Sequence, residues 1–188
     1  MTNNLMIHSI TSYRNIHEMG ALRRLGISPD KKCVDMNRQE LKKTLESAEN
    51  HCHLRGTRFT RKRKVVLSAL LQSNNALTAY ELIDICKTEF GGSLPPMSMY
   101  RILDFLESEG LIHRLKTANR YVACVHINCD HKHAPPQFLI CGRCYRVEEK
   151  DVARTTLGSL TKNVESAGFS LISNQIELEC LCDSCAHG

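Results

Sequence analysis

The stretch LIHRLKTANRYVACV, residues 111–125, predicts a β-hairpin and decides the fold of the first half of the chain. Two short apolar runs rich in Leu, Ile and Val flank a polar turn at Thr117 to Asn119. Such runs around a turn are typical of paired antiparallel strands. The meaning of this hairpin depends on the segments that come before it.

Helices are predicted throughout the segment before the hairpin. From Met36 onward apolar residues recur at helical spacing up to Gly56. Three shorter helices follow, and their start signals are Thr60, the capping box of Thr78 and Glu81, and the pair Pro95 and Pro96. In the first two helices, the residues expected to face the core are Leu41, Leu45, Ala48, Cys52, Val65, Val66, Ala69 and Leu70. Helices followed by a hairpin predict a winged helix-turn-helix.

The last of these helices is expected to be the recognition helix, which enters the major groove of DNA. It carries Ser98, Tyr100 and Arg101. Arg101 is the best candidate for base reading, since an arginine can bridge guanine O6 and N7. Tyr80, near the start of the preceding helix, could reach the DNA backbone or an adjacent base, and a packing role is nearly as plausible.

A block of cations around the start of the helix at Thr60 indicates a polyanionic partner. The net charge of +5 is mild, but this block holds no acid. Cations in a first helical turn oppose the helix dipole, which favours a nearby anion, although a solvated helix start is the plain alternative. The residues predicted to contact phosphates are Arg58, Arg61, Arg63 and Lys64.

A second, smaller unit is predicted after a polar linker rich in histidine. Strands are expected at 138–140 and 146–149, a helix from about Val152 to Ala167 with Leu157, Leu160 and Val164 inward, and a last strand around 176–180. The expected domains are an N-terminal extension or mis-assigned start at 1–35, the winged-helix domain at 36–125, a hinge at 126–136 and a dimerisation domain at 137–188. So small a unit buries little surface, so we expect it to need zinc and a second copy of itself. The fold class is therefore α+β.

Two C-x-x-C pairs predict a structural zinc site in this second unit. The pairs are Cys141 with Cys144 and Cys182 with Cys185. Four thiolates close a tetrahedral zinc site and leave no position open for a substrate. Disulfides or a redox pair are the alternatives, but no signal peptide is apparent, which indicates a reducing compartment. We expect a cytoplasmic protein with no membrane span.

A second group of metal-binding residue types lies at the hairpin, the hinge and the second unit. Its members are His113, Cys124, Cys129, His131, His133 and Glu149. Thiolate and imidazole mixed with a carboxylate favour zinc over iron or manganese. Solvated hinge histidines are the alternative. A metal here would tie the hairpin to the second unit.

The combination of these motifs resembles the ferric uptake regulator family. The resemblance rests on LTAYEL at 77–82, MYRILDFL at 99–106, GLIH at 110–113 and both C-x-x-C pairs, and it covers about Met36 to Cys185. Cys124 and His113 indicate the zinc uptake regulator branch. The family implies a repressor, not an enzyme, that acts as a zinc-loaded homodimer on an AT-rich palindromic operator of double-stranded DNA and represses zinc uptake genes.

The resemblance also implies two zinc ions per chain. Structural zinc would fall on the four cysteines of the C-x-x-C pairs. Regulatory zinc would fall on His113, Cys124, His133 and Glu149, with His131 and Glu148 as alternates. The alternative function is an iron, manganese or peroxide sensor of the same family, against which Cys124 speaks. A zinc-ribbon enzyme and a zinc-stapled interaction module are further alternatives.

Overall fold

The structure, a computed structural model, describes residues 37–90, 94–127, 135–172 and 175–187. These residues belong to one compact unit, Cys33–Gly188. The predicted extension at 1–35 and the hinge histidines His131 and His133 lie outside the described residues. We call residues 37–125 the winged half and residues 135–187 the sheet half.

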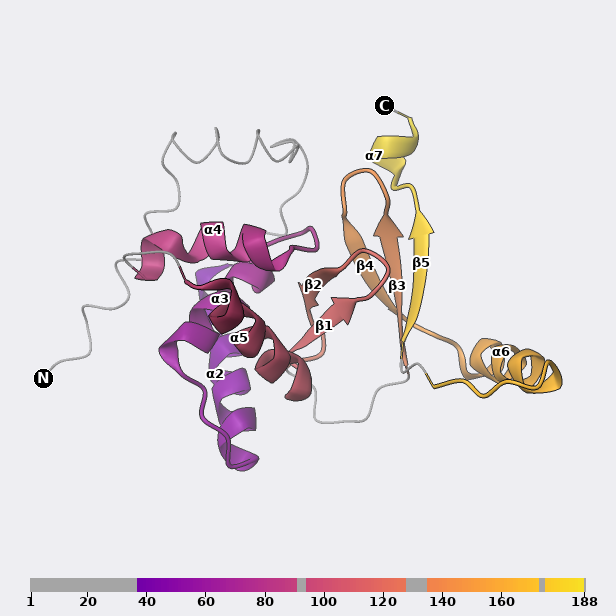
Figure 1. The fold of residues 1–188 in the computed structure, drawn as a ribbon, viewed down its shortest axis with the longest axis horizontal. Helices are drawn as coiled ribbons and strands as arrows, with labels where there is room; N and C mark the ends of the chain where they lie inside the picture. Colours follow the sequence, from indigo (N-terminus) through magenta and orange to yellow (C-terminus); the bar gives the residue numbers. More distant parts are fainter. Residues whose placement is uncertain (1–36, 91–93, 128–134, 173–174, 188) are drawn as a thin grey trace, which may run out of the picture. The chain divides into compact units, whose positions relative to one another are not determined.

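Four helices and a hairpin make up the winged half (Figure 1). The helices are α2 (Arg38–Leu54), α3 (Arg61–Leu71), α4 (Ala79–Phe90) and α5 (Pro96–Ser108). The hairpin pairs β1 (Ile112–Leu115) with β2 (Arg120–Ala123), with His113 opposite Val122. The element order confirms the prediction of helices followed by a hairpin.

Local signals explain where these helices begin and end. Asn37 caps α2 by accepting from the backbone of Gln39 and Glu40 at 2.9 Å. Thr78 and Glu81 form the predicted capping box of α4, since Glu81 N donates to Thr78 Oγ1 and Thr78 N donates to Glu81 Oε2. Gly110, with φ of 71°, ends α5 in the left-handed conformation that favours glycine.

The core of the winged half lies between these helices and the hairpin. Leu41, Leu45, Ala48 and Cys52 are buried on one stripe of α2, as predicted. On α3 the prediction was partly wrong, because Leu67 is fully buried while Val65 and Ala69 are only partly so. The buried stripe of α3 runs through Val66, Leu67 and Leu70. It is therefore shifted towards the C-terminus relative to the predicted stripe. Thr60 sits at the cap position but its side chain makes no capping hydrogen bond.

The sheet half contains a three-stranded sheet in the order β4-β3-β5 (Figure 1). Its strands are β3 (Pro136–Cys141), β4 (Val147–Asp151) and β5 (Ile176–Cys180). The β3–β4 pair is antiparallel and the β3–β5 pair is parallel, which requires the crossover through α6 (Arg154–Ser166). A short helix, α7 (Asp183–Ala186), follows β5.

The expected burial of α6 was wrong for the single chain. None of its residues is buried, and Leu160 is 36% exposed. Leu157 and Val164 are half-buried, and no residue of α6 belongs to either buried core cluster of the described residues. No described helix is long and apolar enough to span a membrane.

Candidate metal centres and nucleic-acid interface

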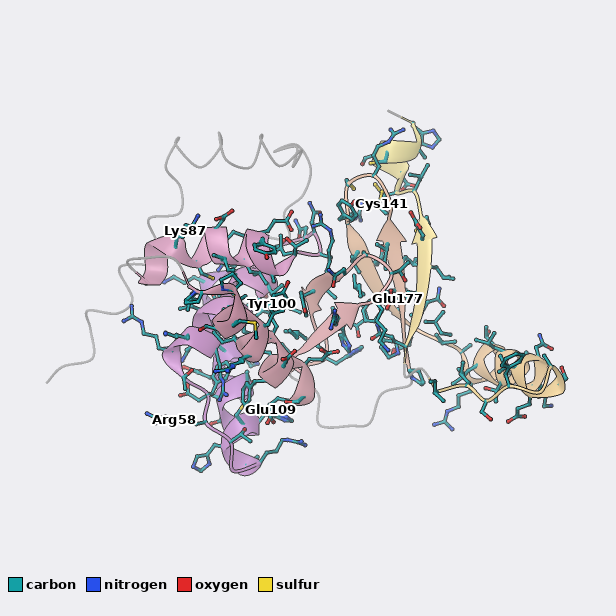
Figure 2. The ribbon with its side chains drawn as sticks, viewed as in Figure 1. Arg58, Lys87, Tyr100, Glu109, Cys141 and Glu177 are labelled. Carbon is teal, nitrogen blue, oxygen red and sulfur yellow. The ribbon has the colours of Figure 1, made fainter. Side chains whose placement is uncertain are left out.

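The first candidate metal centre lies where β3 and β5 end. Cys141 is the last residue of β3, Cys144 lies in the turn to β4, and Cys182 and Cys185 flank the start of α7. Their four sulfur atoms lie within 4.8 Å of one another, and all four cysteines are free thiols. Figure 2 labels Cys141 at this end of the sheet.

Backbone hydrogen bonds bend both C-x-x-C turns around the sulfur atoms. Tyr145, with φ of 59°, donates its N–H to Cys141 O at 2.9 Å. Cys185 N donates to Cys182 O at 2.8 Å, which makes the matching turn on the other pair. Arg143 Nη1 reaches Cys185 O at 2.8 Å and so joins the two turns. Backbone hydrogen bonds and the Arg143 side chain therefore hold both turns in place.

The pKa values of two of these thiols are shifted in opposite directions. Burial raises the pKa of Cys141, but backbone N–H groups of Cys182, Cys144 and Arg143 outweigh it and lower the value to about 6. Desolvation and the other thiols raise the pKa of Cys185 to about 12. The first thiol to ionise is stabilised by the backbone N–H groups. Ionisation of a further thiol is unfavourable, because it would place a second negative charge beside the first.

The geometry of the four sulfurs fits zinc. A tetrahedral zinc with Zn–S of about 2.3 Å places its sulfur atoms roughly 3.8 Å apart. The Sγ atoms of Cys144 and Cys182 are 3.7 Å apart. The four residues thus match a closed structural zinc site in both donor type and spacing.

The second candidate metal centre brings the hairpin and the sheet together. His113 of β1, Cys124 just after β2 and Glu149 of β4 offer ligand atoms that lie within 4.8 Å of one another. His113 Nε2 is 3.6 Å from Glu149 Oε1, and the Glu149 side chain is only 4% exposed. His113 also packs against Phe138, with ring centroids 5.0 Å apart.

The polar atoms of this centre fit a metal ligand set. His113 Nε2 is buried and has no hydrogen-bond partner among the described residues. Burial lowers the pKa of His113, although Glu149 partly opposes this, so the ring is neutral and its free lone pair can bind a metal. A neutral imidazole, a thiol and a buried carboxylate suit zinc.

The alternate ligand Glu148 points elsewhere. Side chains alternate along a strand, so Glu148 and Glu149 lie on opposite faces of β4. Glu148 Oε1 is 2.6 Å from Lys150 Nζ, and its side chain is 49% exposed. The structure does not bring Glu148 to His113 and Cys124.

His126 is a residue of this centre that sequence reasoning missed. Its Nδ1 is 3.3 Å from Glu149 Oε1, and its N–H donates to Cys124 Sγ at 3.4 Å. Glu149 Oε2 also accepts from Val125 N at 3.2 Å. The available signal was its position two residues after Cys124, at the start of the polar segment rich in histidine.

The residues predicted to contact DNA differ in how far they are exposed. Tyr80 is 63% exposed, and Arg58, Arg61 and Arg101 are exposed as well. Ser98 is half-buried, and Tyr100, labelled in Figure 2, is half-buried against the core of the winged half. Exposed side chains on α3, α4 and α5 are therefore available to a duplex.

Two members of the predicted basic block already have partners within the chain. The guanidinium of Arg63 stacks 3.3 Å from the centre of the Phe105 ring and donates to Arg58 O. Lys64 Nζ lies 3.1 Å from Glu49 Oε2. Arg58 and Arg61 line a surface hollow before α3, together with His53 and Thr60. These two are the better placed phosphate contacts.

Comparison with known proteins decides the family. The model of the ferric uptake regulator family matches residues 54–179. The chain belongs to the ferric uptake regulator family. The zinc uptake regulation protein of Escherichia coli (strain K12) is 32% identical over 156 residues, which cover 80% of this chain and 85% of that protein.

Two solved structures of similar proteins share the fold of this family member. A zinc uptake regulator complexed with zinc and DNA has a TM-score of 0.68 and 31% identity, covering 78% of this chain and 95% of its own. The crystal structure of holo XcZur has a TM-score of 0.63 and 32% identity, covering 78% of this chain and 99% of its own. These likenesses and the zinc-regulator relatives support the zinc uptake branch of the family and the predicted fold class.

Proposed function

We propose that the chain is a zinc-responsive transcriptional repressor of zinc uptake genes, active as a homodimer on operator DNA. Membership of a regulator family and the similarity to a zinc uptake regulator that was solved with zinc and DNA support this function. The observation that carries it is the second metal centre, because it joins the hairpin of the winged half to the sheet half.

Two zinc ions per chain are proposed. The four cysteines hold a structural ion that stabilises the sheet half. His113, Cys124 and Glu149 hold a regulatory ion, and the fourth donor is predicted to be His133, with His131 as its alternate. His126 then acts as the hydrogen-bond partner that orients Glu149. The donor set also argues against an iron, manganese or peroxide sensor, since a thiolate favours zinc.

The homodimer is proposed from the uncovered apolar surface of the sheet half. Phe169 is 70% exposed and Ile172 is 93% exposed, while Leu171, Leu178 and Leu181 are 40% to 56% exposed. Large apolar side chains that stay exposed in the single chain favour association, and a symmetric dimer covers the same surface on both copies. A dimer also sets the distance between two recognition helices, which matches a palindromic operator, predicted here to be AT-rich.

The regulatory step follows from which residues the centre connects. When bound, zinc supplies a link between β1, the end of β2 and β4. Glu149 and Cys124 lie on different halves, so a ligand that binds both favours the arrangement in which they are close. Only that arrangement presents both α5 helices to DNA at the spacing of two half-sites.

Zinc content and DNA binding test the proposal directly. The purified chain should hold two zinc ions, one of which mild chelation removes. It should bind an AT-rich palindromic duplex at least tenfold tighter with zinc than after chelation, and a scrambled duplex of the same composition weakly in both states. Equal affinity of stripped and loaded protein for the palindrome would contradict the proposed function.

A matched pair of carboxylate variants tests the ligand assignment. Glu149→Gln should lose the chelator-sensitive zinc and its effect on DNA binding, because Glu149 is buried at the centre. Glu148→Gln on the other face of β4 should keep both, because its carboxylate pairs with Lys150. The reverse result would show that the register of β4 at the site is wrong.

A further inference from the structure

The carboxylate of Glu177 makes a second connection between the sheet and the hairpin. Glu177 lies on β5 and is labelled in Figure 2. Its Oε1 accepts from Lys116 N at 2.9 Å, and its Oε2 accepts from Thr117 N at 2.8 Å and Thr117 Oγ1 at 2.5 Å. Gln175 Nε2 donates to Glu177 Oε1 at 2.6 Å. One side chain thus satisfies both exposed N–H groups at the start of the β1–β2 turn.

The position of Glu177 in the sheet mirrors that of the proposed zinc ligand Glu149. Phe138 of β3 is opposite Glu149 on one side and opposite Glu177 on the other. Residues directly opposite in neighbouring strands point to the same face of a sheet. Glu149, Phe138 and Glu177 therefore form one row across the sheet, and Phe138, which contacts His113, is fully buried in its middle.

The same face of the sheet also packs against the winged half through apolar side chains. Leu115 of β1 forms a buried cluster with Phe138, Ile140 and Ala76. Gln175 Nε2 donates to Arg114 O at 2.8 Å, next to this cluster. The hairpin therefore meets the sheet at three points: at His113, which contacts Phe138 and lies 3.6 Å from Glu149, at Leu115 in the cluster, and at its turn through Glu177.

We propose that Glu177 is a positioning residue that fastens the hairpin turn to the sheet, and so raises both zinc affinity at the second metal centre and operator affinity. This inference rests on the proposed function. Among the described residues, the hydrogen bonds of Glu177 go to Lys116, Thr117 and Gln175, and none goes to His113, Cys124, Glu149 or a residue predicted to meet DNA. It acts by favouring the arrangement that brings His113 and Cys124 to Glu149. Coupling between two sites is reciprocal. If zinc binding stabilises the contact between Glu177 and the turn by some factor, loss of that contact must weaken zinc binding by the same factor.

The charge state of Glu177 agrees with this role. Burial raises its pKa, but the Thr117 hydroxyl and the N–H groups of Thr117 and Lys116 outweigh burial, and the pKa lies below its ordinary value. The carboxylate is ionised at neutral pH, and hydrogen bonds to a charged acceptor are the strong ones.

Glu177→Gln in the full-length zinc-loaded dimer tests the inference. The amide of the variant replaces one acceptor oxygen by an N–H donor. At least one donor of the turn, Lys116 N, Thr117 N or Thr117 Oγ1, then loses its acceptor. Competition with a chromophoric chelator should show the labile zinc bound roughly 5- to 50-fold more weakly, while the structural zinc is retained. Amide hydrogen exchange at Lys116 and Thr117 should speed up, and the AT-rich palindrome should bind more weakly at a fixed zinc concentration.

Two further variants separate positioning from general effects. Glu179→Gln removes the same charge two residues along β5. Because the described structure shows no hydrogen bond between the Glu179 carboxylate and the hairpin, this variant should behave as the parent. Thr117→Val removes one of the three hydrogen bonds from the turn and should shift zinc affinity in the same direction by a smaller factor.

The outcomes distinguish this inference from the function on which it rests. Parent-like zinc affinity and amide exchange in Glu177→Gln would overturn it, as would equal losses in Glu179→Gln. Loss of the structural zinc in Glu177→Gln would also overturn it, since Glu177 would then stabilise the sheet as a whole. A parent chain with no labile zinc would instead overturn the proposed function, and this inference with it.

Discussion

The winged half and the sheet half of this chain obtain their stability in different ways. The winged half has a core of its own, in which Leu67, Leu82, Leu103 and Leu106 have no exposed surface. In the sheet half Phe138, Ile140, Cys141 and Val152 are the buried apolar residues, and α6 contributes none. The sheet half therefore buries less apolar surface of its own, which is why we propose that a structural zinc ion and a second copy stabilise it.

Loss of the structural zinc should break this comparison most completely. Cys141→Ser removes one of four sulfurs, and with it the folding free energy that zinc supplies to the sheet half. We expect the sheet half to unfold while the winged half stays helical. Limited proteolysis with zinc analysis checks this, since the fragment that survives should begin near α2 and hold no zinc. A sheet half as protease-resistant as that of the parent would contradict the prediction.

A cavity in the helical core should have the converse effect. Leu103→Ala, at a fully buried position of α5, should lower the free energy of unfolding of the winged half by about 2–5 kcal/mol. Denaturant unfolding followed by circular dichroism measures the loss. The structural zinc should stay bound at one per chain, because the cysteines lie in the other half. If the zinc were released along with the helices, the two halves would unfold as one unit.

A charge on the uncovered apolar surface should sharpen the role of the second copy. Leu178 of β5 is 45% exposed in the single chain. In a symmetric dimer Leu178→Asp would bring a carboxylate from each copy into the interface, which we expect to weaken association by about 2 kcal/mol, or roughly thirtyfold. Analytical ultracentrifugation measures the dimer dissociation constant. Glu179→Ala is the control, and an unchanged dimer in Leu178→Asp would place the interface elsewhere.

The smallest effect is expected at a helix start in the winged half. Thr78→Ala removes the hydroxyl that accepts from Glu81 N at 3.2 Å, and should cost about 1 kcal/mol of stability. Thermal unfolding should show a small downward shift with zinc content unchanged. Thr60→Ala is a matched control, because the Thr60 side chain makes no capping hydrogen bond and its loss should cost less.

Local sequence patterns predicted most helices and strands. They failed to predict the burial of a side chain where that burial depends on segments far away in the chain or on a second copy. The capping box at Thr78 and the hairpin at 112–123 depend on neighbours in sequence, and both are confirmed. The apolar stripe of α6 was read correctly as a helix, but its burial was wrong because no residue of α6 joins a buried core cluster of the described residues. Periodicity identifies an apolar face without identifying what packs on it.

The candidate metal centres divide in the same way. The four ligands of the first centre could be predicted from the spacing of the C-x-x-C pairs, since each turn directs two sulfur atoms to one point. The second centre draws His113, Cys124 and Glu149 from three places in the chain, and its partner His126 was missed. The resemblance preferred Glu149 with Glu148 as its alternate, and the pairing of β4 with β3 separates the two, because adjacent residues of a strand face opposite sides.

By itself, the amino-acid sequence determined the helices, the hairpin, the family and the two sets of zinc-binding residue types, because turn chemistry, periodicity and ligand spacing are local. Only the tertiary structure decided that Glu149 and Glu177 flank Phe138 in one row beneath the hairpin. That row joins residues far apart in the chain, and its members become neighbours only when β3, β4 and β5 pair. The coupling proposed between zinc and the hairpin depends on that pairing.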